Sequence, residues 1–129
     1  MTDHSLDDLD ADLYPLCLKW LDECSAAGLK VKVLVTYRSA ADQNEAKAKG
    51  LSNAGAGQSP HNCTDDEGNP ASCAFDFGCF TPESEYITDG REIEYTQAGQ
   101  IAKGLGLVWG GDFHSFPDYD HIETKDWRL

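Results

Sequence analysis

The sequence has few basic residues and no long apolar run. Ten Lys and Arg stand against 23 Asp and Glu, so the formal net charge is −13. Nucleic-acid phosphates attract positive charge, and anionic lipid surfaces do the same, so this balance argues against both as partners. No apolar segment approaches the ~20 residues that a transmembrane helix needs. We therefore expect a protein that binds neither nucleic acid nor membrane.

The chain also lacks a secretory signal and paired metal-binding cysteines. Its first residues, MTDHSLDDLDADLY, are acidic and have no basic region followed by an apolar one, so we expect synthesis in a cytoplasm. An odd cysteine count and a reducing compartment argue against a disulfide framework. Without a CxxC pair, a structural zinc site of four thiolates is also disfavoured. The five cysteines are Cys17, Cys24, Cys63, Cys73 and Cys79.

A length of 129 residues predicts one domain, residues 1–129, and we expect a monomer. Apolar residues at helical spacing predict a helix over about 14–27, and the β-branched alternation of Lys30 to Tyr37 predicts a strand. Further helices are expected at 40–49 and 95–103, and further strands at 74–80, 107–109 and 121–123. This order favours an α+β fold, a small and mainly antiparallel sheet with helices packed on it.

Two histidines and one carboxylate form a candidate metal site at this sheet. His61 ends a Gly-rich loop, Asp76 lies in an apolar strand, and His121 begins the last strand. A carboxylate in an apolar strand is costly unless it is paired or metal-bound. Two imidazoles and a carboxylate, with a fourth position left for water, are a donor set of catalytic zinc. Asp118, three residues before His121, can serve that water as a base.

The same residues also allow a plainer interpretation. Histidines are often structural, and Asp76 can belong to the polar face of a half-exposed strand. Aspartates suit turns, which would explain Asp112, Asp118 and Asp120. Residue types and spacing alone leave both interpretations open.

Four ordered motifs resemble those of a known enzyme family. Residues 58–62 and 74–77 resemble the two halves of the pattern Ser-x-His-x-x-Gly-x-Ala-x-Asp, and residues 118–121 resemble its last element, an acidic residue, two spacers and His. Residues 35–39 and 106–112 match as well, so the similarity covers about 10–125. The chain resembles the zinc peptidases that act on peptidoglycan peptides. These include D-Ala-D-Ala carboxypeptidases and dipeptidases, and phage endolysins that are L-alanyl-D-glutamate endopeptidases.

The resemblance implies a role for each motif residue. His61, Asp76 and His121 would bind Zn²⁺, Asp118 would be the catalytic base, and Arg38 would hold substrate or stabilise the oxyanion. If Asp118 were not the base, Asp120 or Glu123 would be the alternative acid.

The resemblance also implies the substrate, a peptidoglycan stem peptide. The leading hypothesis is a phage-type endolysin that cleaves the L-Ala–D-Glu bond of the wall after the membrane is permeabilised. Two alternatives stay open. One is a D-Ala-D-Ala carboxypeptidase or dipeptidase, and the other is a zinc-stabilised binding domain without catalysis.

The chain departs from the family pattern in two places. The motif separates its His and Asp by seven positions, whereas His61 and Asp76 are fifteen apart, and the family Gly is lost or displaced. We expect the eight extra residues, within 63–72, to form a hairpin that brings Cys63 and Cys73 close enough for a disulfide after release from the cell. They would otherwise be two small buried residues, or one thiol would be a zinc ligand. The second departure is Asp120, where many relatives carry an apolar residue or Pro.

Overall fold

The computed structural model describes residues 2–49, 59–125 and 127, and within them it shows an α+β fold with one antiparallel sheet of five strands. The strand order is β1-β2-β5-β4, and β3 pairs with the C-terminal end of β2. The strands are β1 (Lys30–Val35), β2 (Ala74–Phe80), β3 (Tyr86–Ile87), β4 (Val108–Trp109) and β5 (His121–Glu123). The helices are α1 (Leu13–Ala26), α2 (Ala40–Ala48) and α3 (Ile93–Gly104). Short 3-10 turns occur at Leu6–Asp8, Pro60–Asn62 and Gly110–Asp112.

Strand β2 divides its side chains between the core and the candidate site. Side chains of a strand alternate between the two faces of the sheet. Phe75, Phe77 and Cys79 are buried in the hydrophobic core, so Asp76 and Gly78 face the other way. The expected fold class is therefore confirmed, and one strand carries both core and site.

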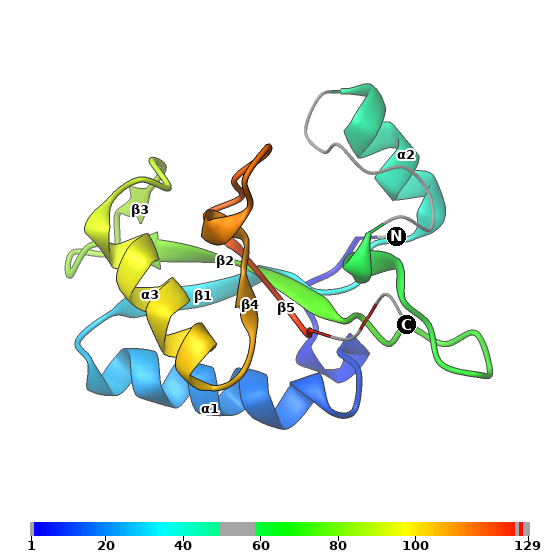
Figure 1. Cartoon of the computed structure of the whole chain (residues 1–129), viewed down its shortest axis with the longest axis horizontal. Coiled ribbons are helices and arrows are strands. Elements are labelled where there is room, and N and C mark those ends of the chain that lie inside the picture. Colours follow the sequence, from blue (N-terminus) through cyan, green and yellow to red (C-terminus); the bar gives the residue numbers. More distant parts are fainter. Residues whose placement is uncertain (1, 50–58, 126, 128–129) are drawn as a thin grey trace.

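The helices α1 and α3 pack against the same face of the sheet (Figure 1). Helix α1 contributes Trp20, whose ring centroid lies 5.1 Å from that of Phe75 and 5.0 Å from that of Phe77. The buried Trp20 indole N–H donates a 3.0 Å hydrogen bond to the Ala98 carbonyl of α3. This bond joins the two helices at the centre of the core, because a buried indole N–H needs a partner.

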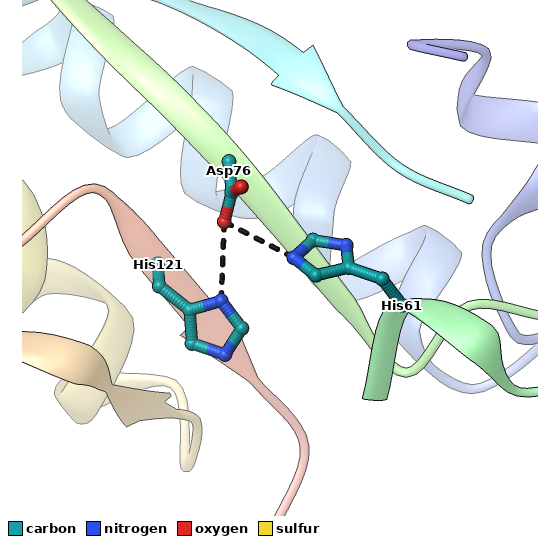
Figure 2. A group of neighbouring side chains, drawn as sticks. All are labelled: His61, Asp76 and His121. Carbon is teal, nitrogen blue, oxygen red and sulfur yellow. Dashed lines mark hydrogen bonds and ion pairs between the residues drawn. The ribbon is translucent and has the colours of Figure 1, made fainter. Parts of the chain in front are cut away.

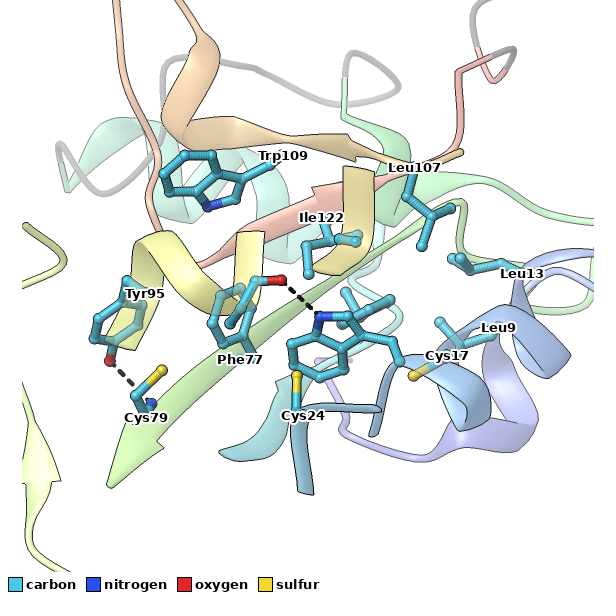
Figure 3. Close-up of a cluster of buried hydrophobic side chains, with 14 residues drawn as sticks. Leu9, Leu13, Cys17, Cys24, Phe77, Cys79, Tyr95, Leu107, Trp109 and Ile122 are labelled. Atoms are coloured by element: carbon cyan, nitrogen blue, oxygen red, sulfur yellow. Dashed lines mark hydrogen bonds between the residues drawn. The ribbon is translucent and has the colours of Figure 1, made fainter. Parts of the chain in front are cut away.

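A second tryptophan links the core to the loop that precedes β5. Trp109 lies among the buried side chains together with Tyr95 and Phe77 (Figure 3). A Cβ atom on Gly99 of α3 would lie 2.3 Å from the Trp109 ring, so only glycine fits there. The Trp109 indole N–H donates a 2.8 Å hydrogen bond to the Tyr119 carbonyl. Packing of α3 therefore fixes the chain two residues before His121.

The element boundaries agree closely with those expected from the sequence. Helix α1 starts at Leu13 and accommodates Pro15 in its first turn, where a missing N–H costs little. Strand β1 ends at Val35, two residues short of Tyr37. Helix α2 is capped by the Ser39 hydroxyl, which accepts a 3.2 Å hydrogen bond from the Asp42 N–H. No helix in the described part of the chain has the length and apolar character needed to cross a membrane.

The extra residues between His61 and Asp76 form the expected hairpin. Thr64 pairs with Pro70, the Ala71 N–H donates to the Cys63 carbonyl at 3.0 Å, and the Cys73 N–H donates to the Pro60 carbonyl at 2.9 Å.

The hairpin brings the side chains of Cys63 and Cys73 together as free thiols. A hydrogen bond between them lowers the pKa of Cys63 to about 7 and raises that of Cys73. A disulfide between them under oxidising conditions stays a prediction.

Two glycines of α3 give a matched test of the packing. We expect Gly99→Ala to lower the free energy of unfolding by about 1–3 kcal/mol, because its new methyl group collides with the Trp109 ring. Gly104→Ala meets nothing within 4 Å and should be neutral or stabilising by up to about 1 kcal/mol. Denaturant unfolding of both variants measures the difference, and equal effects would contradict this account.

Candidate metal centre and catalytic site

The structure brings the three predicted metal ligands together. His61 Nε2 and His121 Nδ1 each lie 3.1 Å from the same oxygen, Asp76 Oδ1 (Figure 2). The donor atoms lie within 4.8 Å of one another. Both imidazoles are buried, and the Asp76 side chain is 17% exposed. Residues sixty positions apart in the chain thus present two nitrogens and one oxygen to one small volume.

Strand pairing explains how Asp76 and His121 meet. In the register of β2 and β5, Asp76 pairs directly with His121. Directly paired residues of antiparallel strands place their side chains side by side on the same face. Since Phe75 and Phe77 occupy the core face, the Asp76 and His121 side chains meet on the other face.

A short turn with its own hydrogen bonds positions His61. The Ser59 hydroxyl accepts from the His61 N–H at 3.2 Å, and the Asn62 side-chain oxygen accepts from the Ser59 N–H at 3.3 Å. This reciprocal cap, with Pro60 at its start, is why the run Ser-Pro-His-Asn forms a rigid turn. The Asn62 amide donates to the Arg38 carbonyl at 2.7 Å, and the Arg38 N–H donates to the His61 carbonyl at 2.9 Å. The backbones of Arg38 and His61 therefore lie side by side.

The two imidazoles present opposite ring nitrogens to Asp76. His61 Nδ1 lies 2.7 Å from the Thr36 carbonyl oxygen, which can only accept, so Nδ1 carries the proton. His121 Nε2 lies 2.9 Å from Glu123 Oε1, and its Nδ1 faces Asp76. An oxygen thus contacts one nitrogen of each ring, which leaves His61 Nε2 and His121 Nδ1 for a metal.

Glu123, which the sequence analysis named only as an alternative base, contacts His121 instead. It is buried, with 4% of its surface exposed, and its second oxygen accepts a 2.6 Å hydrogen bond from the Trp127 indole N–H. Because both oxygens are occupied, Glu123 orients His121 and is a poor candidate for a base. The signal was present in the sequence, since residues 121 and 123 of one strand share a face.

Electrostatic interactions stabilise this cluster of two buried histidines and one partly buried carboxylate. Burial alone would raise the pKa of Asp76, but His61 and His121 outweigh it and hold that pKa well below its usual range. Burial likewise opposes the charge on His121, yet hydrogen bonds to Asp76 and Glu123 raise its pKa to about 10. His121 therefore lies between two carboxylates, Asp76 and Glu123, that favour its charged form.

Asp118 lies at the edge of this cluster, as the motif predicts. Its Oδ2 is 4.0 Å from His121 Nδ1, and its side chain is 42% exposed. Burial and a hydrogen bond to Asp118 raise the pKa of Asp120 to about 9. This direction favours the neutral form of Asp120, so Asp118, whose side chain is 42% exposed, is the better candidate for the base.

Gly110 fixes the loop that carries Asp118. The Asp118 N–H donates to the Gly110 carbonyl at 2.9 Å, and a Cβ on Gly110 would lie 2.2 Å from the Asp118 carbonyl oxygen. The backbone strands can approach this closely only because residue 110 has no side chain. The Trp-Gly-Gly-Asp run therefore serves to place Asp118 beside His121.

The donor set fits a divalent metal ion. Two neutral imidazole nitrogens and one carboxylate oxygen are ligands that zinc accepts, and three protein ligands leave a position open. In the part of the chain that the structure describes, neither Cys63 nor Cys73 joins a cluster of three donors. A thiol ligand is thus not supported.

Comparison with known proteins agrees with this geometry. The model of a D-alanyl-D-alanine carboxypeptidase family matches residues 36–124, which is more than half of the chain. The chain is 28% identical to the peptidoglycan L-alanyl-D-glutamate endopeptidase CwlK of Bacillus subtilis, over 88% of this chain and 74% of that protein.

Two solved structures share the fold. The L-Ala D-Glu endopeptidase ChiX of Serratia marcescens matches with a TM-score of 0.69 and 21% identity, over 93% of this chain and 83% of that one. The LD-carboxypeptidase LdcB matches with a TM-score of 0.61 and 15% identity, over 93% of this chain and 62% of that one. Fold and site together define a metallopeptidase. The chain belongs to peptidase family M15 and is a peptidoglycan-hydrolysing enzyme.

Metal content tests the ligand assignment. We expect one metal ion per chain, lost in His61→Ala and in His121→Ala because each variant removes one of three donors. His4→Ala changes an exposed histidine outside the cluster and should keep the metal. Elemental analysis of protein purified without a histidine tag measures this, and full retention in both ligand variants would contradict it.

Glu123→Gln tests the orienting contact behind His121. The variant keeps the size of the side chain but loses its charge, so we expect metal affinity to fall about 10–100-fold. Glu83→Gln, an exposed residue, is the control for the change in net charge. Competition with a chromophoric chelator gives both dissociation constants, and an unchanged constant in Glu123→Gln would refute the contact's role.

The raised pKa of His121 gives metal affinity a defined pH dependence. Metal binding at Nδ1 must displace the proton held there, and raising the pH towards about 10 removes that proton in advance. The association constant should therefore rise about tenfold per pH unit around neutrality, and activity should fall on the acid side. Chelator competition at several pH values measures the slope, and a constant independent of pH would show that no proton is displaced.

Proposed function

We propose that this protein is a zinc endopeptidase that cleaves the L-Ala–D-Glu bond of peptidoglycan stem peptides. The observation that supports this most is the cluster of His61, Asp76 and His121 with the accessible Asp118 at its edge. Two of the similar proteins are L-alanyl-D-glutamate endopeptidases. The Trp-Gly-Gly-Asp run and an Asp rather than a Glu as base also resemble that branch.

The three ligands, and zinc as the metal, are part of this proposal. When bound, the ion supplies a Lewis acid for the scissile carbonyl and makes the attacking water more acidic. His61 and His121 hold their donor nitrogens in place through the Thr36 carbonyl and Glu123. Because the cluster is largely buried, bulk water is excluded from all but the open side.

The remaining chemistry falls to two residues of the chain. Asp118 accepts the proton of the attacking water and passes it to the leaving amine, which its exposure and its place beside His121 allow. Arg38 binds the substrate or stabilises the developing oxyanion, as its permanently charged planar group suits. The Arg38 N–H donates to the His61 carbonyl, which places residue 38 next to a proposed ligand in the fold.

A carboxypeptidase is the second candidate. The family model that matches is described as D-alanyl-D-alanine carboxypeptidase, and LdcB, an LD-carboxypeptidase, shares the fold. Such an enzyme would use the same metal and base and differ in its substrate pocket. A binding domain without catalysis is disfavoured by the accessible Asp118.

We also propose that the enzyme acts as a monomeric phage-type endolysin, made in a host cytoplasm and acting on the wall once the membrane is permeabilised. Turbidity loss of permeabilised but not of intact bacteria would support this. Lysis of intact cells at the same rate would contradict the dependence on permeabilisation, and light scattering tests the monomer.

Mass spectrometry of digested peptidoglycan identifies the bond. New N-terminal D-Glu, with L-Ala left on the glycan strand, is the expected product. Release of free D-Ala alone would indicate the carboxypeptidase, and no cleavage by metal-loaded protein would refute hydrolysis altogether.

Asp118→Asn tests the base. The variant should fold and keep its metal, but kcat should fall by about 10²–10⁴ because amide nitrogen cannot accept the water's proton. Asp112→Asn, in the same loop but paired with Lys103 at 2.9 Å, is the control and should stay near wild type. Near wild-type turnover in Asp118→Asn would assign the base to another group.

A further inference from the structure

The uncovered face of the sheet carries a strip of side chains that leads away from Asp76. The strip lies on the same face as Asp76, since residues 76, 78 and 80 of β2 alternate with the core residues. Its apolar members are accessible, with Leu34 39% and Tyr86 49% exposed. We call this set the sheet strip; it consists of Lys32, Leu34, Gly78, Phe80 and Tyr86.

The sheet strip forms an apolar floor next to the metal ligand. A Cβ on Gly78 would lie 2.8 Å from Tyr86 Cε1 and 2.9 Å from Leu34 Cδ1, so these two side chains close over bare backbone. Tyr86 also lines, together with Asp118, an open pocket of about 200 Å³. Tyr86 thus connects the floor to the proposed base Asp118, although none of the three proposed metal ligands lines this pocket.

Lys32 places a positive charge beyond this floor. In the register of β1 and β2 it pairs with Gly78, and its Nζ lies over the Phe80 ring, 5.0 Å from the centroid. Among the described residues no carboxylate oxygen lies within 4.0 Å of that nitrogen. By contrast, Lys103 lies 2.9 Å from Asp112 and Arg91 lies 3.1 Å from Asp89.

An ammonium on an aromatic ring can still bind an anion. The ring holds one side of the cation, and the remaining N–H donors point outward. Several other described lysines also lack a carboxylate within 4.0 Å, so what distinguishes Lys32 is its place in β1, on the sheet face that holds Asp76. Lys32 thus offers a positive charge to an anionic ligand on the sheet face that holds Asp76.

The spacing along β2 indicates which part of a bound peptide the Lys32 ammonium can contact. Gly78 lies about 7 Å and Phe80 about 13 Å along the strand from Asp76, at ~3.3 Å per residue. A peptide chain advances ~3.5 Å per residue, so Lys32 reaches a group about two or more residues from the scissile bond. The carboxylates of a stem peptide lie on the carboxyl side of the L-Ala–D-Glu bond, because D-Glu and the chain end supply them.

We propose that Lys32 binds the carboxylate of the second stem residue after the scissile bond. The leaving part of the peptide then lies over Leu34, Gly78 and Tyr86, with its amino end at Asp118. The identity of the bond rests on the proposed function; the subsite adds the direction of the substrate and the class of group recognised, an anionic peptide end.

Matched substrates test this subsite. The peptides N-acetyl-L-Ala–γ-D-Glu–L-Lys with a free carboxylate and with a carboxamide at the chain end differ only in the charge that Lys32 would bind. We expect Lys32→Gln to raise KM about twofold to fivefold for the carboxylate peptide, with kcat within about twofold of wild type and little change for the carboxamide. Lys32→Arg should restore the preference. Lys19→Gln, an exposed lysine of α1 on the helical side, controls for net charge.

Equal effects of Lys32→Gln on both peptides, or an equal effect of Lys19→Gln, would overturn the subsite. Binding of the fragment γ-D-Glu–L-Lys to the wild-type and Lys32→Gln proteins, measured by calorimetry, separates the subsite from the choice of bond. If neither tripeptide is cleaved but fragment binding still depends on Lys32 and on the free carboxylate, the subsite holds and the assigned bond is wrong. If fragment binding depends neither on Lys32 nor on the free carboxylate, the proposed subsite is wrong, whichever bond the enzyme cuts.

Discussion

One carboxylate oxygen, Asp76 Oδ1, is the point on which the site depends. It receives both imidazoles at 3.1 Å, from a turn and from a strand that are far apart in the chain. A largely buried carboxylate without a partner is costly, so the two histidines stabilise Asp76 in the sheet as well as offering donor nitrogens. Since Phe75 and Phe77 anchor the same strand in the core, errors in core packing are transmitted directly to the ligand.

Hydrogen bonds on the far side of the two imidazole rings fix the orientation of the proposed ligands. The Thr36 carbonyl fixes the ring of His61, and Glu123 fixes that of His121. Trp109 and Gly110 connect the α3 side of the core to the loop of Asp118. The catalytic geometry is therefore a property of the whole fold, although only a few side chains face the open side.

Much of this could be predicted from the sequence, because the local signals are strong. The alternation in β1, the Ser39 cap of α2 and the Ser-Pro-His-Asn turn each depend on neighbouring residues alone. The contact of Glu123 with His121 was signalled by their spacing in one strand, but the raised pKa of Asp120 and the position of Lys32 could not be predicted. They depend on the register of β5 and β1 against β2, and on burial that only the folded chain creates.

The hairpin between the first two ligands has a consequence for how such enzymes vary. Backbone hydrogen bonds from Ala71 to Cys63 and from Cys73 to Pro60 hold the two ends of the hairpin together. The positions of His61 and Asp76 therefore do not depend on the residues at its tip. The interval between His61 and Asp76 in the chain is thus uncoupled from their distance in space. A segment at the tip can be lengthened, shortened or exchanged for a wall-binding or labelling peptide as a module. Sequence patterns that require a fixed interval between these two ligands would miss relatives that carry such a module.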